Sequence, residues 1–217
     1  MNGIFITFEG PDGAGKTTQL KRLAEELKEQ GYDILVTREP GGTVISDKIR
    51  SIILDPAHRE MVDQAEVLLY AASRAQHVHE LIIPALQAGK IVLCDRFIDA
   101  SVAYQAHGLG IAAEQVKAIS AFASSGLQAT RTYLLDVPVE VSLSRLQQRA
   151  SAAAGQGLDR IEQKHAAYHS RVREGFHAIA ADNPARVCVI DAHRSEDAIA
   201  ADIRQDCEQL LKEHISV

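Results

Sequence analysis

The feature that most constrains the fold of this chain is a short apolar segment followed at once by a glycine-rich loop. Residues 4–9 end in an acidic residue, and Gly10-Pro-Asp-Gly-Ala-Gly-Lys-Thr17 follows directly. This matches the pattern G-x-x-x-x-G-K-[ST] in full, which requires a strand before it and a helix after it. The glycines let the backbone curl so that successive N–H groups point inward, and the helix N-terminus adds positive charge. The segment is typical of an α/β protein that binds phosphate.

Four further apolar runs resemble residues 4–9. They are rich in Ile, Val and Leu, and several end in a charged residue. Near-continuous apolar runs are typical of strands that are covered by helices on both faces, with polar groups at the carboxyl edge. The sequence predicts strands at 4–9, 33–38, 91–95, 132–137 and 187–191.

Helical patterns lie between these strands. Apolar residues recur at helical spacing in 20–27, 139–150, 161–179 and 199–210, and the first stripe is closed by Gly31. Residues 61–87 predict a long helix, bent near Pro84. Alternating strands and helices predict crossover units and a parallel sheet. The expected fold class is α/β, with a five-stranded parallel sheet flanked by helices.

No repeat or linker divides the chain, so we expect one domain over residues 1–217. Within it, residues 150–157 are small and include two glycines, which predicts a mobile loop between two helices. We expect a short lid at about 149–160.

Composition narrows the class of partner. The net charge of −6 argues against a nucleic acid partner held by its phosphates, but a local basic pocket can still bind a small anion. Three widely spaced cysteines in apolar segments predict buried thiols in a reducing compartment. No signal peptide and no run long enough to span a bilayer is present in the sequence. We therefore expect a cytoplasmic protein that binds neither nucleic acid nor membrane.

The glycine-rich loop predicts an ATP site. Lys16 would reach the β- and γ-phosphates, and the Thr17 hydroxyl would ligate Mg²⁺. Asp95, which ends a buried strand, would hold the Mg²⁺ through water. With a predicted strand before the loop and a predicted helix after it, a chance match to the pattern is far less frequent than a true phosphate-binding loop. The predicted ATP-binding residues of the loop are Gly10, Pro11, Asp12, Gly13, Ala14, Gly15, Lys16, Thr17 and Thr18.

The loop alone leaves GTPase switches, motor ATPases and small-molecule kinases open. The chain has no Asn-Lys-x-Asp segment for guanine recognition, and 217 residues leave no room for motor elements. Arg38 and Arg96 lie just beyond the carboxyl ends of predicted strands, where ligands bind in open α/β sheets. Two guanidinium groups suit a second phosphate, which favours a kinase for nucleoside monophosphates over one for nucleosides. A nucleotide-dependent switch or scaffold stays open as the alternative outside enzymes.

Four ordered segments resemble the bacterial thymidylate kinases, which are P-loop nucleoside monophosphate kinases, and the likeness covers essentially the whole chain. These segments are residues 8–18, 38–43 (R-E-P-G-G-T), 69–77 and 95–105 (D-R-F-I-D-A-S-V-A-Y-Q). Ala100 stands where that last signature normally has Ser, and 106–110 also departs from the family. The resemblance implies the P-loop NTPase three-layer fold and transfer of the γ-phosphoryl group of ATP to dTMP, giving dTDP and ADP for dTTP synthesis. It also implies Mg²⁺ and, with the long helix packed against its twin, a homodimer.

The resemblance assigns roles around dTMP. Tyr70, where the family usually has Phe, stacks on thymine, and Arg74 donates to a thymine carbonyl; their spacing alone indicates only one turn of an amphipathic helix. Tyr104 packs under the sugar and disfavours a ribose, while Asp12 accepts from the 3′-hydroxyl. The implied dTMP-binding residues are Asp12, Arg38, Tyr70, Arg74, Arg96, Ser101, Tyr104 and Gln105.

The family also carries a catalytic arginine either in the P-loop or in the lid. Residues 11–14 contain none, so the lid should supply it. Arg149 is expected on the ATP side, and Arg160, at the start of the next helix, is expected at the γ-phosphate in the closed state. The expected catalytic residues are Lys16, Asp95, Arg96 and Arg160. His165 and His169 share a helix face but have no third ligand, which favours surface histidines over a metal site.

Overall fold

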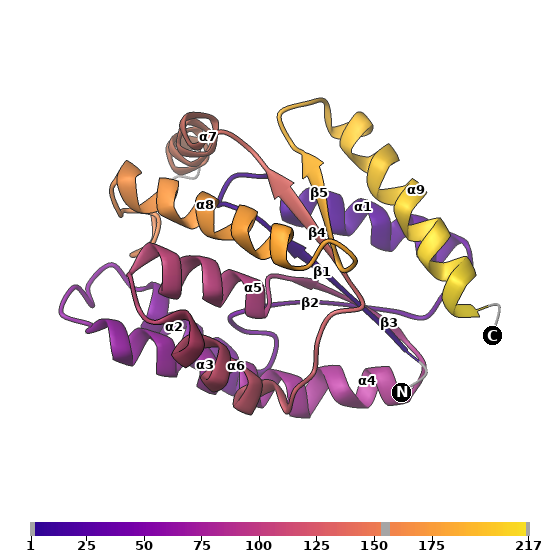
Figure 1. The fold of residues 1–217 in the computed structure, drawn as a ribbon, viewed down its shortest axis with the longest axis horizontal. Helices are drawn as coiled ribbons and strands as arrows, with labels where there is room; N and C mark the ends of the chain where they lie inside the picture. The colour runs from indigo at the N-terminus through magenta and orange to yellow at the C-terminus, as the bar shows by residue number, and fades with distance from the viewer. Residues whose placement is uncertain (1–2, 153–156, 216–217) are drawn as a thin grey trace.

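A five-stranded parallel sheet forms the centre of the protein, with helices on both faces (Figure 1). The computed structural model describes residues 3–152 and 157–215. The strand order is β2-β3-β1-β4-β5, and each neighbouring pair is parallel. The strands are β1 Ile4–Glu9, β2 Ile34–Arg38, β3 Ile91–Asp95, β4 Arg131–Asp136 and β5 Val187–Asp191. The predicted fold class is confirmed, and no predicted strand is displaced by more than one residue.

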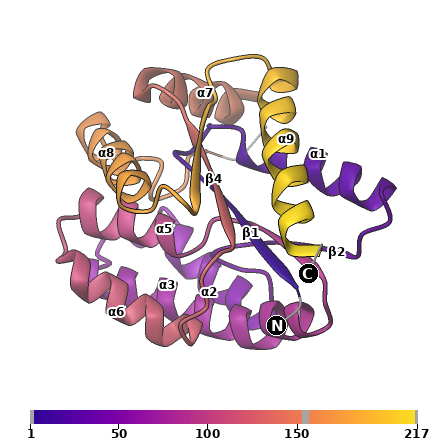
Figure 2. The same cartoon turned by 45° about the vertical axis from the view of Figure 1, so that its right-hand side comes forward.

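One face of the sheet is covered by α1 (Lys16–Glu29) and α9 (Glu196–Ile215), as Figure 2 shows. The predicted stripe of α1 is buried here: Leu20, Leu23 and Leu27 are each less than 4% exposed. The predicted stripe of α9, including Ile203 and Leu210, is buried in the same cluster. These residues pack on β1, β3, β4 and β5, and so fix the start of α1 at the carboxyl edge of the sheet.

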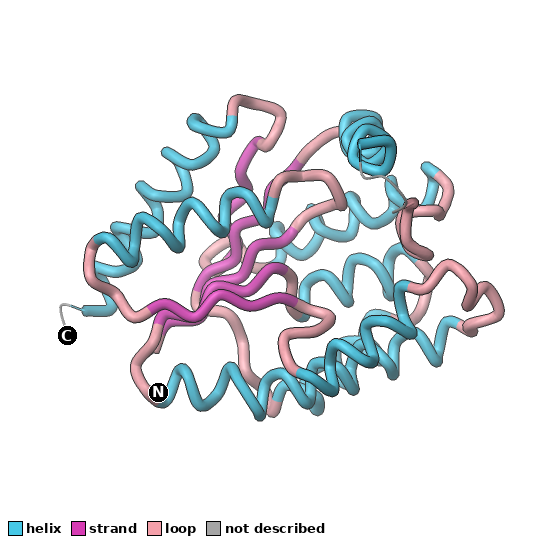
Figure 3. Tube along the Cα trace, turned by 180° about the vertical axis from the view of Figure 1, so that it is seen from behind, coloured by secondary structure: helices cyan, strands magenta, loops and turns pink. Residues whose placement is uncertain are grey.

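Further helices cover the opposite face, so that the strands lie between two helical layers (Figure 3). The predicted long helix consists of α3 (Asp63–His77), a π-helical turn η1 (Val78–Ile82) and α4 (Ile83–Gln87). The π-helical turn ends at Ile82, two residues before Pro84, which has no N–H to donate to an α-helical ladder. A second π-helical segment, η2 (Val102–Gly108), packs against α8 (Ala166–Asp182).

Three other helices were not predicted, and one of them is a short helix that precedes η2. They are α2 Val44–Leu54, α5 Ile98–Ser101 and α6 Ala113–Ser124, while α7 Val139–Ala152 agrees with the prediction. A sequence signal for α2 does exist, since the Thr43 side chain caps its first turn by accepting from the Ser46 N–H.

The helix predicted to begin near Ile161 begins only at Ala166, and this part of the prediction was wrong. The Asp159 carboxylate accepts hydrogen bonds from the backbone N–H groups of Ile161 and Glu162, which closes a local turn. His165 is then extended at the N-cap. Arg160 therefore lies in a turn and does not open a helix.

Of the other predictions about side chains, some are confirmed and some are wrong. His169 is buried rather than on the surface. Cys94 and Cys207 are buried, whereas Cys188 is only half-buried, and all three are free thiols. Residues 153–156 of the predicted lid lie outside the described residues. In the described part of the chain, no helix is both long and apolar enough to cross a membrane.

The packing of α1 gives a testable prediction. Leu20→Ala removes a side chain that is 1% exposed, and we expect it to lower the free energy of unfolding by about 3 kcal/mol. The matched control is Lys21→Ala, which changes an exposed neighbour and should stay within about 0.5 kcal/mol. Urea denaturation of both variants measures the difference. If Leu20→Ala and Lys21→Ala unfold at the same urea midpoint, the packing described for α1 is contradicted.

Candidate active site

Residues predicted to bind phosphate and metal lie close together at the carboxyl ends of β1, β2 and β3. In the parallel register Asp95 pairs with Phe8 on one side and with Arg38 on the other. The Thr17 hydroxyl, in the first turn of α1, donates to Asp95 Oδ2 at 2.5 Å. The strand register therefore places the hydroxyl and carboxylate predicted for the metal next to each other.

The loop from Gly10 to Gly15 is curled as its sequence predicts. Gly10, Gly13 and Gly15 all have positive φ. A Cβ on Gly10 would lie 2.3 Å from the Leu135 carbonyl oxygen, so only glycine fits against β4. Lys16 Nζ donates to the carbonyls of Gly10 at 3.0 Å and Pro11 at 2.7 Å. Burial, together with the charge of Arg96, lowers the pKa of Lys16 to about 8.

A groove runs along this loop and is rich in arginine. The whole loop from Asp12 to Thr18 lines it, together with Asp95. The carbonyl of Gly13 accepts from Arg145 Nη1 at 3.1 Å, so α7 closes the groove on one side. Its arginines are Arg38, Arg50, Arg96, Arg145, Arg149 and Arg194.

A second cavity adjoins the groove. Seven of the eight residues predicted for dTMP line it; the exception is Arg38, which lies in the groove. The seven are Asp12, Tyr70, Arg74, Arg96, Ser101, Tyr104 and Gln105. Residues that line both cavities form a common wall, and these are Asp12, Glu39, Arg50, Arg96 and Asp159. We call this second cavity the acceptor pocket.

Asp12, Arg96 and Tyr104 form one hydrogen-bonded cluster at the common wall. Arg96 Nη2 donates to Asp12 Oδ1 at 2.6 Å, and the Tyr104 hydroxyl donates to Asp12 Oδ2 at 2.7 Å. Burial alone would raise the pKa of Asp12, but the charges of Arg96 and Lys16 outweigh it and hold that pKa well below its usual range. Arg96 has a φ of 71°, a strained conformation for a residue with a side chain. The backbone is thus held where the guanidinium faces both cavities.

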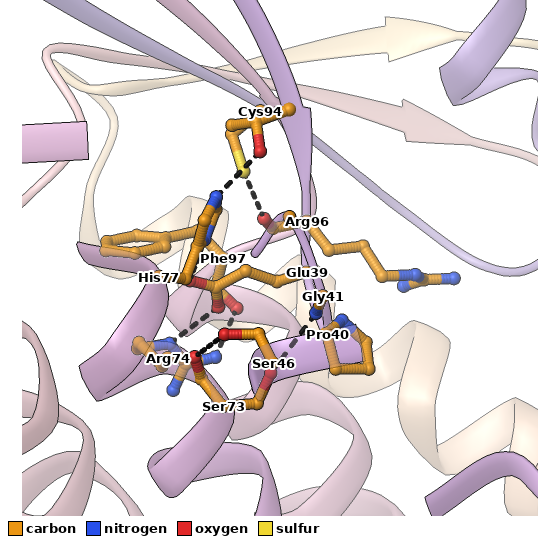
Figure 4. Close-up of polar contacts among 12 residues, drawn as sticks. Glu39, Pro40, Gly41, Ser46, Ser73, Arg74, His77, Cys94, Arg96 and Phe97 are labelled. Atoms are coloured by element: carbon orange, nitrogen blue, oxygen red, sulfur yellow. Dashed lines mark hydrogen bonds and ion pairs between the residues drawn. The ribbon is translucent and has the colours of Figure 1, made fainter. Parts of the chain in front are cut away.

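Arg74 is fixed by a buried network below the acceptor pocket (Figure 4). Its Nε donates to Glu39 at 2.8 Å, and its Nη2 donates to the Phe97 carbonyl at 3.1 Å and to Ser101 at 2.9 Å. His77 lies on the other side of Glu39, with its Nδ1 at 3.0 Å from the carboxylate. Because Glu39 meets both, the orientation of the Arg74 guanidinium is set before any ligand binds.

The sequence prediction missed residues that belong to the site. Glu9, directly before the loop, is buried and accepts from the Phe97 N–H at 2.7 Å. Burial and the nearby charge of Asp99 raise the pKa of Glu9 to about 8. Glu39 belongs to the R-E-P-G-G-T segment, but the sequence indicates no role for it. Arg50 lines both cavities, and the signal for it lies in α2, which was not predicted.

The two arginines predicted beside the lid are placed differently. Arg149 lines the groove and pairs with Glu162, and its place on the ATP side stays a prediction. Arg160 lines neither cavity, and its Nη2 donates to Glu66 at 2.7 Å. In this structure the Asp159 turn directs Arg160 toward α2 and α3, and its contact with the γ-phosphate in the closed state stays a prediction.

Comparison with known proteins shows the family of this chain. A family model described as thymidylate kinase matches residues 8–203. The chain belongs to the thymidylate kinase family. It is 53% identical over 212 residues to the thymidylate kinase of Exiguobacterium sibiricum, covering 98% of this chain and 97% of that one. It is 48% identical to the enzyme of Geotalea uraniireducens, covering 92% and 95%.

A crystal structure of thymidylate kinase from Ehrlichia chaffeensis is similar as well. It aligns with a TM-score of 0.75 and 31% identity over 94% of this chain and 98% of that one. These matches confirm the predicted P-loop NTPase fold and the predicted function, ATP-dependent phosphorylation of dTMP to dTDP. The individual site residues stay predictions.

The lowered pKa of Lys16 predicts the pH dependence of this kinase. Below pH 8 the ammonium group is charged and attracts phosphate; above it the charge is lost, so kcat/KM for ATP should fall about tenfold per pH unit. At saturating ATP, kcat should fall less, because bound phosphates favour the charged form. Steady-state kinetics from pH 6 to 9.5 measure both quantities.

Glu9 titrates in the same range, so Glu9→Gln is the control. If Lys16 is responsible, the fall in kcat/KM for ATP persists in that variant. A profile that stays flat to pH 9.5, or a fall that disappears with Glu9→Gln, contradicts the prediction.

Proposed function

We propose that this kinase binds ATP in the arginine-rich groove and dTMP in the acceptor pocket, and transfers the γ-phosphoryl group across their common wall. The observation that carries the proposal is that wall, where Asp12 and Arg96 face both cavities. Two anionic substrates that react must approach each other, and a cation between them reduces their repulsion. Catalysis is then positioning and charge neutralisation, without a covalent intermediate.

On the donor side, the backbone N–H groups of residues 12–18 bind the phosphates and Lys16 meets the β- and γ-phosphates. In the described structure Lys16 Nζ is held by two loop carbonyls, at the place where phosphate oxygens would replace them. Thr17 and Asp95 fit Mg²⁺, because they bring a hydroxyl and a carboxylate oxygen together on the groove. When bound, the ion supplies positive charge to the phosphates, and Asp95 is placed to hold one of its waters.

On the acceptor side, Arg38, Arg50 and Arg96 meet the phosphate of dTMP. Arg50 is the addition made by the structure: it lines both cavities, and its Nη1 donates to the Pro40 carbonyl at 2.9 Å. Burial and the charge of Arg38 lower the pKa of Arg50. Arg38 is paired with Asp47 and Arg96 with Asp12, whereas no carboxylate among the described residues pairs with Arg50, so Arg50 lacks a matching anion. A phosphate would supply it.

The base lies at the other end of the acceptor pocket. Arg74 and Ser101 hydrogen-bond to each other there, and Tyr70 lines the same cavity. Gln105 donates its Nε2 to Glu66, so its carbonyl Oε1 is the group left to face a ligand. That oxygen suits the N3–H of thymine. Tyr104, held by Asp12 and Arg96, supports the deoxyribose.

Charge that develops on the transferred group is met by Arg96 and by the arginines of α7. Arg145 and Arg149 both line the groove, and Arg149 is mostly exposed, so it can reach a nucleotide. The buried place of Arg160 does not support the catalytic part first expected for it. We also propose a cytoplasmic location, supported by three free cysteines, and a part in dTTP synthesis.

A pair of acceptors tests the acceptor pocket. We expect kcat/KM for dTMP to exceed that for its ribose analogue by at least about tenfold, because Tyr104 occupies the space under the sugar. Tyr104→Ala should reduce this ratio, and Lys16→Ala should abolish transfer to both acceptors without changing the unfolding midpoint. Coupled ADP release is the measurement. Equal use of the two acceptors by the unmodified enzyme contradicts the assignment of this pocket to dTMP.

We further propose a homodimer formed by α2, α3 and α6. These helices pack side by side and expose large apolar side chains. The exposed residues are Val44, Ile45 and Ile52 on α2, Leu68 on α3 and Phe122 on α6. Phe122 is 88% exposed, which is costly for an aromatic ring in water and is typical of an interface anchor.

Phe122→Asp should therefore convert the dimer into a monomer. The physical reason is that a charge at the centre of an apolar interface loses its hydration without a partner. Sedimentation or light scattering measures the mass, with Val189→Asp as control, because Val189 is exposed on β5, away from these helices. A Phe122→Asp protein that keeps the mass of the unmodified protein contradicts this interface.

A further inference from the structure

Arg160 is held firmly beside the acceptor pocket although it does not line it. Its Nη2 lies 2.7 Å from Glu66 Oε2, its Nε donates to the Ile53 carbonyl at 2.7 Å, and its backbone N–H donates to the Leu54 carbonyl at 3.1 Å. The side chain of Arg160 is 10% exposed and that of Glu66 only 1%. This is a buried ion pair between the turn after residue 157 and helix α3.

The second carboxylate oxygen of Glu66 connects this ion pair to Gln105, at the end of the pocket where the base is proposed to lie. Glu66 Oε1 accepts from Gln105 Nε2 at 3.0 Å, and Gln105 is itself 1% exposed. A carboxylate only accepts hydrogen bonds, so the amide nitrogen of Gln105 must face it. The Gln105 carbonyl is therefore the group that the pocket offers to a base.

The neighbours of Arg160 in the chain form part of the same pocket. Asp159 and Ile161, on either side of it, both line the pocket, as does Leu54, whose carbonyl binds the Arg160 N–H. The bonds of Arg160 to Glu66 and to the end of α2 therefore also fix the side of the pocket formed by Leu54, Asp159 and Ile161. One ion pair sets both the wall and the orientation of a base-facing amide.

We propose that Arg160 is a positioning residue for recognition of the acceptor base, acting through Glu66 on Gln105. This rests on the proposed function, in which the base lies at Gln105. The N3 of thymine carries a hydrogen and donates, whereas the N3 of cytosine accepts. A carbonyl fixed toward the pocket accepts from thymine and repels cytosine, and the Arg160–Glu66 pair holds it in that orientation.

Variants of Arg160 and Glu66 test this. Arg160→Met keeps the length of the side chain and removes the charge, Arg160→Lys keeps the charge, and Glu66→Gln replaces the carboxylate with an amide that can donate as well as accept. For each we measure Tm, kcat, KM for dTMP, KM for ATP and the ratio of kcat/KM for dTMP to that for dCMP.

We expect Arg160→Met to raise KM for dTMP and to lower the dTMP:dCMP ratio by about tenfold or more, the scale for a lost or reversed hydrogen bond. Its kcat at saturating substrates and its KM for ATP should change by less than about threefold, because no contact with the donor groove is lost. Arg160→Lys should restore part of the ratio. Glu66→Gln should lower the ratio even where stability is retained, so it decides the outcome if Arg160→Met does not fold.

Two results would overturn the proposal. A loss of kcat with an unchanged KM for dTMP and an unchanged ratio would make Arg160 a catalytic residue. A lower Tm with all kinetic parameters unchanged would make the pair purely structural. Arg131→Gln is the control for loss of a partly buried ion pair, because Arg131 pairs with Asp206 between β4 and α9.

Gln105→Leu separates this proposal from the proposed function. If Gln105→Leu leaves KM for dTMP and the dTMP:dCMP ratio unchanged, the base does not lie at Gln105, and the proposed pocket itself is wrong. If Gln105→Leu changes both while the Arg160 and Glu66 variants change neither, only the present proposal fails.

Discussion

The ion pair between Arg96 and Asp12 is the interaction on which the rest of the site depends. It joins the end of β3 to the phosphate loop after β1, and Arg96 also donates to the Gly10 carbonyl and to Tyr104. Both partners are largely buried, so removing either one would leave an uncompensated charge. The positive φ of Arg96 is tolerated because these bonds fix both the backbone and the side chain. The donor groove and the acceptor pocket share a wall because of this pair.

The acceptor pocket is built from buried carboxylates that each bind two groups. Glu39 meets Arg74 and His77, and Glu66 meets Arg160 and Gln105. A carboxylate with both oxygens engaged leaves its partners little freedom to turn. The ligand therefore meets donors and acceptors that are already oriented, and less of its binding energy is lost in ordering them.

The sequence predicted the strands and the phosphate loop well because both depend on local pattern. Apolar runs mark buried strands wherever they occur, and the glycine spacing of the loop is a property of the loop alone. The position of Arg160 could not be predicted in this way, since its partner Glu66 lies 94 residues away and the Asp159 turn interrupts an apparently helical stripe. Glu39 and Glu66 were missed for the same reason: they act on other side chains, and no spacing along the chain records those contacts.

The arginines of the site fall into two classes, those paired with a carboxylate and those without such a partner. Arg74 and Arg160 are each matched by a buried carboxylate, so their charge is already neutralised and their remaining effect is directional. Arg145 bonds to backbone carbonyls, which leave its charge unmatched, whereas Arg96 is paired with Asp12 and also lowers the pKa of Lys16. Of the groove arginines, Arg50 and Arg145 have no carboxylate partner among the described residues, within a chain of net charge −6. Binding of phosphates relieves the repulsion among these cations, whereas the matched arginines gain nothing from an anion. Charge matching therefore supports the proposal that Arg50, Arg145 and Lys16 bind the phosphates and that Arg74 and Arg160, which are matched by carboxylates, act on the base.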